Sequence, residues 1–282
     1  MDGRARAPAA GTVLNALATG YGSAFAIDRY VEATVTLGGE RVRGEIDGQP
    51  DADTTLIERT VKRVLEAHGD GGGATVRTES DVPSASGLKS SSAAANAAVL
   101  ATLSALDATE DVTRENAARI GVEAARDAGV TVTGAFDDAS ASMLGGLTIT
   151  DNTADELIGR DTVDWEVAIW VPPEQGFSAD ADVERCERIA PVAEIVRELA
   201  ESGRYEPAMT INGFAFAGAL ERPSEPMVEA LPDAEGVSLS GTGPSYVAVG
   251  AGPAIDAVQD RWKKRTGKTI RTRTQSRGAT VE

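Results

Sequence analysis

The chain has 282 residues, of which 41% are hydrophobic, and its net charge is −17 at pH 7; at about 150 residues per domain, this length predicts two packed domains. No apolar run approaches the roughly 20 residues of a membrane span, and dense negative charge argues against general nucleic-acid binding, so we expect neither partner. A single cysteine, Cys186, and a single histidine, His68, exclude an internal disulfide and a zinc site of the usual Cys/His type.

Two strands are predicted early in the chain. Residues 30–37 and 40–46 alternate apolar and polar side chains, and Gly38 and Gly39 separate them. Alternation is typical of a half-buried strand, and two such strands that turn at glycines predict a β-hairpin.

Helices and strands follow in the next hundred residues. Apolar residues recur at helical spacing between Leu56 and Leu65, with Asp51 or Asp53 as a candidate N-cap and Gly69 beyond the end. The other predicted elements are a strand over 74–80, an alanine- and leucine-rich helix that ends near residue 106, a helix from its cap Thr113 to Gly129, and a strand over 143–150.

The polar stretch 151–162 predicts a boundary between an N-terminal domain, residues 1–155, and a C-terminal domain, residues 156–282. The C-terminal domain mixes both kinds of element, which favours an α+β fold for the whole chain. Its predicted strands are 165–171, 236–240, 245–250 and 268–273, and its predicted helices are 184–202, 207–221 and 254–265.

The strongest chemical signal is the loop PSASGLKSSSAAA, residues 83–95. Glycine and other small residues let the backbone approach an anion, and serine hydroxyls bind phosphate oxygens or a metal ion. The helix that follows points its positive N-terminal end at the same place. The sequence therefore predicts a phosphate-binding loop, although neither a Walker GxxxxGK[ST] nor a GxGxxG motif is present.

This loop resembles the PxxxGLGSSAA motif of the GHMP kinases, named for galactokinase, homoserine kinase, mevalonate kinase and phosphomevalonate kinase. Lys89 stands where most members have glycine, and Ser92 where many have alanine. The residues that match are Pro83, Gly87, Leu88, Ser90, Ser91 and Ala93.

Three further segments are similar to the same family. SLSGTGPSYVAVG, residues 238–250, resembles its C-terminal glycine loop, and TGAFDDASASMLGG, residues 133–146, resembles the segment that supplies an acidic residue near the reacting hydroxyl. Residues 7–28 resemble the first motif, with Ala10 at the place of a frequent lysine. Together with the wording GLKSSSAAANA and TGAFDDA, they most resemble the archaeal shikimate kinases, a GHMP branch.

The resemblance implies a GHMP kinase architecture, with a ribosomal-S5-like N-terminal domain and a ferredoxin-like C-terminal domain. ATP and substrate would lie between the two domains. The implied activity is ATP-dependent phosphorylation of a small-molecule hydroxyl, most closely that of shikimate to shikimate 3-phosphate. The N-terminal residues have no long apolar run behind their charges, unlike a secretory signal, so the expected location is the cytoplasm. A homodimer is compatible with this resemblance.

The resemblance also implies site residues. Ser91 is the expected Mg²⁺ contact. Asp127 is the expected metal carboxylate; it stands at i+4 from Glu123, so both acids can lie on the same face of a helix. The loop residues expected to bind ATP are Pro83, Ser84, Ala85, Ser86, Gly87, Leu88, Lys89, Ser90, Ser91, Ser92 and Ala93. The residues expected to contact substrate are Thr12, Asn15, Ser23, Thr131, Ser240, Gly241, Thr242 and Gly243.

Asp137 and Asp138 are neighbouring carboxylates in an otherwise small and apolar segment. One of them can accept the proton of the substrate hydroxyl, and the alignment alone leaves open which one. We favour Asp138 as the base, with Asp137 as its supporting neighbour, because two close carboxylates raise the pKa of one of them. The alternative is a pair that only positions substrate.

Other functions fit parts of the pattern. Homoserine kinase suits the wording SGTGPS and the missing lysine of the first motif, and a GHMP-fold regulator would bind a ligand without catalysis. The serine loop together with the acidic pair favours an enzyme. Only five of the 27 basic residues are lysine, and an acidic, lysine-poor surface predicts a protein adapted to high salt, where screening suppresses self-repulsion.

Overall fold

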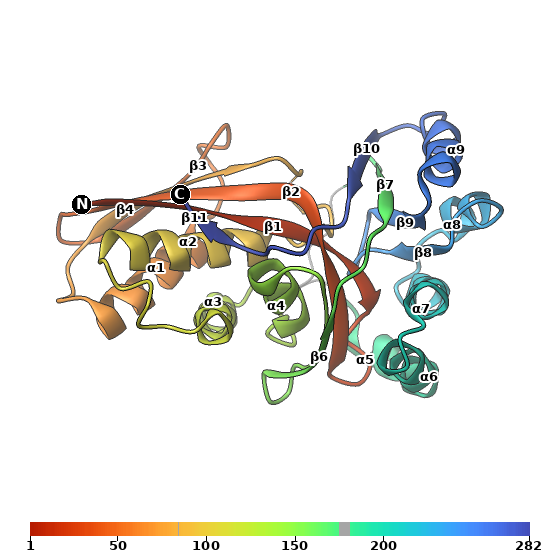
Figure 1. Cartoon of the computed structure of the whole chain (residues 1–282), viewed down its shortest axis with the longest axis horizontal. Helices are drawn as coiled ribbons and strands as arrows, with labels where there is room; N and C mark the ends of the chain where they lie inside the picture. Colours follow the sequence, from red (N-terminus) through yellow and green to blue (C-terminus); the bar gives the residue numbers. More distant parts are fainter. Residues whose placement is uncertain (84, 175–180) are drawn as a thin grey trace.

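The structure is a computed structural model that describes residues 1–83, 85–174 and 181–282, so the expected loop residue Ser84 lies outside the described residues. Two β-sheets lie side by side along the long axis, and helices cover one face of each (Figure 1). The chain is therefore an α+β protein, as the mixed pattern of elements predicted.

Among the described residues, the first sheet has seven strands in the order β11-β1-β2-β4-β3, and β5 and β6 continue from β2. β1 and β2 are long antiparallel strands that form its spine. Most residues of these two strands belong to the first family motif, residues 7–28, where the sequence predicted no strand. The strands are β1 Asp2–Leu14, β2 Tyr21–Leu37, β3 Val42–Ile46, β4 Ala74–Ser80, β5 Leu147–Asp151, β6 Glu156–Asp161 and β11 Thr280–Val281.

The hairpin predicted from residues 30–37 and 40–46 is wrong. β3 pairs in parallel with β4, and β4 pairs antiparallel with β2, so β4 lies between the two strands expected to be neighbours. Parallel neighbours need a crossover connection, and helix α1, Thr55–His68, provides it. Alternation identifies the residues of a strand but says nothing about its partner.

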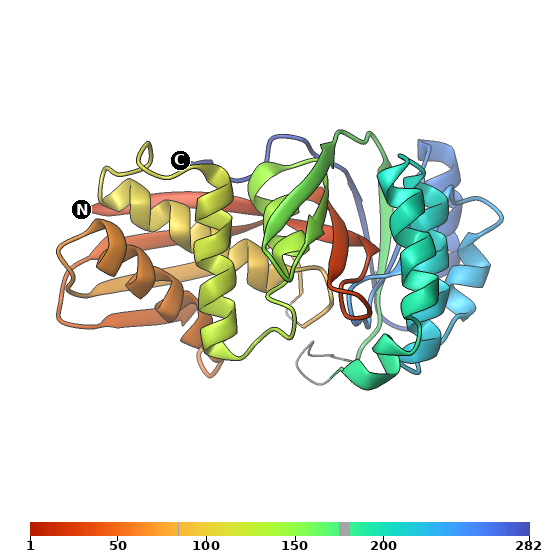
Figure 2. The ribbon, with the colours of Figure 1, turned by 90° about the horizontal axis from the view of Figure 1, so that it is seen from below.

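Helices α1 to α4 cover one face of this sheet (Figure 2). α2, the alanine-rich helix, lies close against the strands: a Cβ on Gly3 of β1 would be 2.0 Å from the Ala101 carbonyl oxygen. The predicted ends of α3 are confirmed, because Thr113 accepts the cap hydrogen bond from Asn116 and Gly129 adopts the left-handed conformation. The helices are α2 Ser90–Ala105, α3 Arg114–Ala128 and α4 Phe136–Leu144.

The second sheet has the order β10-β7-β9-β8. With helices after its first and third strands, this is the strand order of a ferredoxin-like domain, which confirms that expectation. The helix predicted over 184–202 is two helices, because Pro191 starts a new one. The elements are β7 Glu166–Val171, β8 Gly236–Leu239, β9 Tyr246–Gly250, β10 Lys268–Arg273, α5 Val183–Glu187, α6 Ala190–Glu201, α7 Tyr205–Ala219, α8 Glu225–Ala230 and α9 Gly252–Trp262.

The expected domain boundary between residues 155 and 156 falls inside the β5–β6 hairpin, in which Asp151 faces Glu156. β6 therefore completes the first sheet, and the change of sheet comes after Asp161. The C-terminal strand β11 then returns to pair with β1, so that both termini lie at the same end of the molecule (Figure 1).

Candidate active site

A cavity of about 710 Å³ opens where the start of α2, the start of α4 and the glycine loop between β8 and β9 meet. Segments far apart in the sequence line it: Thr12 near the end of β1 and residues 15–17 after it, residues 85–87 and 89–92, residues 129–135, and Gly241 with Thr242. No helix in the described part of the chain is long and apolar enough to cross a membrane.

The phosphate loop forms one wall of this cavity. The first turn of α2 also faces the cavity, and its backbone N–H groups have no partner within the helix, as required for binding an anion. Leu88 and Ala93 are fully buried and anchor the loop rather than line the cavity. The loop residues that do line it are Ala85, Ser86, Gly87, Lys89, Ser90, Ser91 and Ser92.

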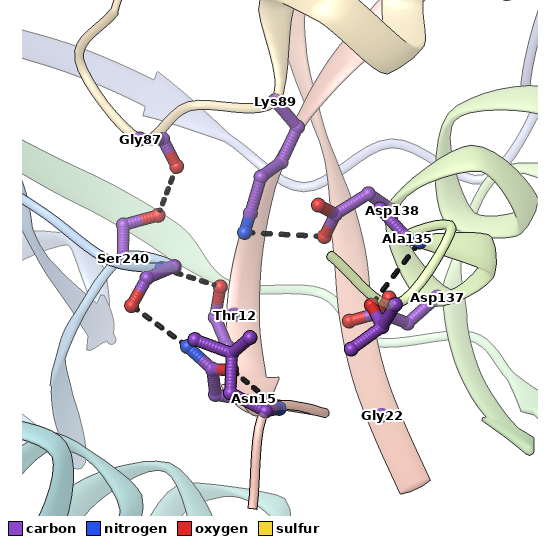
Figure 3. Close-up of polar contacts among 12 residues, drawn as sticks. Thr12, Asn15, Gly22, Gly87, Lys89, Ala135, Asp137, Asp138 and Ser240 are labelled. Atoms are coloured by element: carbon purple, nitrogen blue, oxygen red, sulfur yellow. Dashed lines mark hydrogen bonds and ion pairs between the residues drawn. The ribbon is translucent and has the colours of Figure 1, made fainter. Parts of the chain in front are cut away.

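The glycine loop packs directly on the phosphate loop. Ser240 Oγ donates to the Gly87 carbonyl oxygen at 2.8 Å (Figure 3). The Ser245 N–H donates to the Ser86 carbonyl oxygen at 3.2 Å. Gly87 has a φ of +80°, and a Cβ there would lie 2.4 Å from the Ser240 carbonyl oxygen. Only glycine allows this approach, so the two loops form one unit.

Two residues of the first motif hold the glycine loop from the other side. The Gly241 N–H donates to Thr12 Oγ1 at 2.8 Å, and Asn15 Nδ2 donates to the Gly241 carbonyl oxygen at 2.9 Å. The Asn15 N–H in turn donates to Asn212 Oδ1 of α7 at 2.9 Å. Thr12 and Asn15 therefore line the cavity and also fix its shape.

Asp137 lies in the first turn of α4 and is 4% exposed. Its Oδ1 accepts a 2.7 Å hydrogen bond from Asn152 Nδ2, and its N–H donates to Asn152 Oδ1 at 3.1 Å. A Cβ on Gly22 would lie 2.6 Å from the Asp137 carboxyl carbon, so β2 leaves room for this carboxylate. The geometry gives Asp137 a fixed position.

Asp138 faces the phosphate loop. Lys89 Nζ lies 3.1 Å from Asp138 Oδ1, and the two side chains are 9% and 14% exposed (Figure 3). The contact is an ion pair rather than a well-directed hydrogen bond. Burial and, next, the charge of Asp137 raise the pKa of Asp138 to about 7, while Lys89 opposes the rise. A carboxylate with this pKa can accept a proton near neutral pH.

Backbone strain gathers at the same cavity. Ala85, Lys89 and Ala135 have φ values of 52°, 63° and 53°, in the left-handed region that favours glycine. Lys89 is the N-cap of α2, and Ala135 is the N-cap of α4. Non-glycine residues in this conformation are costly and concentrate at functional sites. The strain supports the assignment of this cavity as the active site.

The structure does not bring Asp127 to the cavity. Its carboxylate lies 2.5 Å from Arg63 Nη2 of α1, and Glu123 pairs with the same arginine at 2.8 Å. The helical spacing did place both acids on one face of α3, but this face packs toward α1. The residues of α3 that do line the cavity are Gly121, Val122 and Ala125, and none of them has an acidic side chain.

The expected substrate residues divide into two groups. Thr12, Asn15, Thr131, Gly241 and Thr242 line the cavity. Outside its lining, Ser23 is fully buried in β2 and Ser240 bonds to Gly87, while Gly243 packs beside Leu239.

Sequence reasoning missed three asparagines that shape the site. Asn152 holds Asp137, Asn212 holds Asn15, and Asn96 Nδ2 donates to the Ala139 carbonyl oxygen of α4 at 2.9 Å. All three are at most 2% exposed. An asparagine inside an apolar helix such as α2 or α7 is a usable signal, because a buried amide needs hydrogen-bond partners.

The donor groups at the cavity fit Mg²⁺. In the described residues no three His, Cys, Asp or Glu side chains gather as a metal cage, but Mg²⁺ at kinase sites is held by one or two carboxylates together with phosphate oxygens. The Ser91 hydroxyl, which lines the cavity in the first turn of α2, supplies an oxygen donor beside the place where the phosphates would bind.

The fold and site define a class of protein. Residues 55–146 match the family model for the GHMP kinases N terminal domain. Homoserine kinase from Cytophaga hutchinsonii superposes with a TM-score of 0.77 at 19% identity, covering 100% of this chain and 97% of that chain. Mevalonate kinase from Methanococcus jannaschii gives 0.75 at 12% identity, covering 96% and 98%. These likenesses establish a GHMP kinase fold.

Sequence relatives are more specific. Shikimate kinase from Halobacterium salinarum is 62% identical over 281 residues, with 99% of both chains covered. Shikimate kinase from Methanothrix thermoacetophila is 51% identical, with 99% of this chain and 96% of the relative covered. The chain therefore belongs to the GHMP kinase family, in the branch of these shikimate kinases, which confirms the resemblance seen in its motifs.

Proposed function

We propose that the chain transfers the γ-phosphoryl group of ATP to shikimate and forms shikimate 3-phosphate. The observation that carries the proposal is the phosphate loop facing Asp138 across one cavity. Full-length relatives named shikimate kinase support the choice of acceptor. The homoserine kinase from Cytophaga hutchinsonii is 19% identical to this chain, a likeness that shows the fold alone.

The proposed mechanism relies on positioning and charge. The N–H groups of the first turn of α2 and the hydroxyls of Ser90 and Ser91 hold the phosphates. Asp138 accepts the proton of the substrate hydroxyl as its oxygen bonds to the γ-phosphorus, and the bond from that phosphorus to the β–γ bridging oxygen breaks, releasing ADP. Asp137, fixed by Asn152, keeps the first turn of α4 in place.

We propose that the Ser91 hydroxyl also contacts Mg²⁺, which would neutralise charge on the phosphate oxygens. On the acceptor side, Thr12, Asn15 and Thr131 line the cavity and offer donors and acceptors for the hydroxyls of shikimate.

The test is an ADP-release assay on the purified chain in molar KCl, with shikimate, homoserine and mevalonate supplied separately. We expect turnover with shikimate and a phosphate ester at its 3-position, located by phosphorus NMR. Faster turnover with homoserine or mevalonate would refute the assignment of shikimate as the acceptor. ATP binding without turnover of any of the three acceptors would refute the proposal that the chain is a kinase.

A further inference from the structure

Lys89 is out of place by the local rules of helix structure. It is the N-cap of α2, yet its side chain makes no capping hydrogen bond, and its backbone is left-handed, with φ 63° and ψ 27°. N-caps favour Ser, Thr, Asp, Asn or Gly, and the left-handed region favours glycine. A lysine satisfies neither preference. Its presence at a strained position beside the cavity indicates that the side chain has a function.

The Lys89 side chain runs inward, to the point where three elements meet. Its ammonium forms the ion pair with Asp138 of α4, and both partners are largely buried (Figure 3). The glycine loop leaves room for this ammonium, because a Cβ on Gly241 would lie 2.6 Å from Lys89 Nζ. The ammonium thus lies among the phosphate loop, the glycine loop and the acidic pair.

The charge balance of the cavity depends on this one residue. Among the described residues that line it, Lys89 carries the only positive charge, whereas Asp53, Asp137 and Asp138 carry carboxylates. Removal of one partner of a buried ion pair leaves the charge of the other uncompensated, so loss of Lys89 would leave these carboxylates without a cation in the described lining of the cavity.

We propose that Lys89 is a positioning residue of the phosphoryl transfer: its ammonium fixes the Asp138 carboxylate to the phosphate loop, so that the base and the bound phosphates move as one unit. The inference rests on the proposed function. It assigns Lys89 to orientation of the base, in place of the phosphate contact expected of a loop lysine.

The surroundings of Asp138 agree with this role. Burial and Asp137 favour the protonated acid, and Lys89 is the cation that opposes them. Without the ammonium, the Asp138 carboxylate would take up a proton at higher pH and would be free to turn away from the acceptor hydroxyl. A lysine that served only to bind ATP would have neither effect.

The test is Lys89→Met, which keeps the length of the side chain and removes its charge. We expect kcat to fall by about 10²-fold, the range of a general-base contribution, with the KM for ATP changed by less than about threefold. The acid limb of the kcat profile should move to higher pH. Lys62→Met, on the exposed face of α1, is the matched control and should behave as the unchanged chain.

A double-mutant cycle with Asp138→Asn identifies the route of the effect. If Lys89 acts through Asp138, Lys89→Met should cost little in the Asp138→Asn background. Equal losses in both backgrounds, or a rise in the KM for ATP with kcat and pH profile unchanged, would overturn the inference. Lys89→Gln, also uncharged, carries the same expectation if the methionine variant does not fold.

The unchanged chain is assayed with shikimate in the same series. Its failure to turn over shikimate would refute the proposed function, whereas normal turnover by both the unchanged chain and Lys89→Met would refute the role of Lys89 alone.

Discussion

At the scale of single residues, the acidic pair combines two carboxylates with different surroundings. Asp137 is fixed by the Asn152 amide, and Asp138 faces the lysine of the phosphate loop. This difference in partners, rather than the sequence, separates their proposed roles.

Asp138→Asn should lower kcat and kcat/KM for shikimate together by about 10²-fold or more, because asparagine keeps the size of the side chain but cannot accept a proton. Steady-state kinetics at saturating ATP is the measurement. Near-normal kcat with a raised KM would instead show that the pair only positions substrate.

Asp137→Asn should shift the pH dependence of kcat in one definite direction. The Asp137 charge raises the pKa of Asp138, so its removal should lower that pKa. Since the base must be ionised, the acid limb of the kcat profile should move to lower pH, with activity retained at pH values where the unchanged chain has lost it. An acid limb that stays in place or moves to higher pH contradicts this account.

Ser91→Ala removes one hydroxyl from the first turn of α2, where Ser91 lines the cavity. We expect the Mg²⁺ concentration needed for half-maximal turnover to rise, with an unchanged melting temperature. Ser92→Ala, its neighbour on the same turn, is the control. Identical magnesium dependence in the two variants would remove Ser91 as a proposed ligand.

At the scale of elements, the site depends on contact between two loops that come from different sheets. Gly87→Ala should separate them, because the new Cβ would meet the Ser240 carbonyl oxygen at 2.4 Å. We expect weaker ATP binding by calorimetry and a melting temperature several degrees lower, from a left-handed alanine that costs about 1–2 kcal/mol plus the clash.

Gly71→Ala is the matched control for this change. Gly71 has a φ of +76°, and a Cβ added there would meet no atom within 4 Å, so this variant carries the same backbone cost without the clash. If both variants lose stability equally and neither weakens ATP binding, the contact between the loops does not shape the phosphate site.

At the scale of the whole molecule, the charge of −17 is the dominant feature. We predict that the melting temperature and turnover both rise between about 0.2 M and molar KCl, since screening at these concentrations shortens the Debye length from several Å to about 3 Å and weakens self-repulsion. Thermal unfolding across a KCl series is the measurement. A melting temperature that is flat or falls with KCl would contradict adaptation to salt.

The sequence by itself determined the local features of this protein. The phosphate loop, the caps Thr113 and Gly129 and the strand order of the C-terminal sheet followed from residue patterns or from the family resemblance that the motifs carry. Such features depend on residues close together in the chain, or on motifs specific enough to identify a fold.

Only the tertiary structure decided which distant residues meet. It placed β4 between β2 and β3, turned Asp127 toward Arg63, and joined Lys89 to Asp138 across 49 positions of the chain. Helical spacing fixes which residues share a face, and alternation fixes which residues form a strand. Neither fixes what packs against them, because that choice depends on the burial of the whole chain at once.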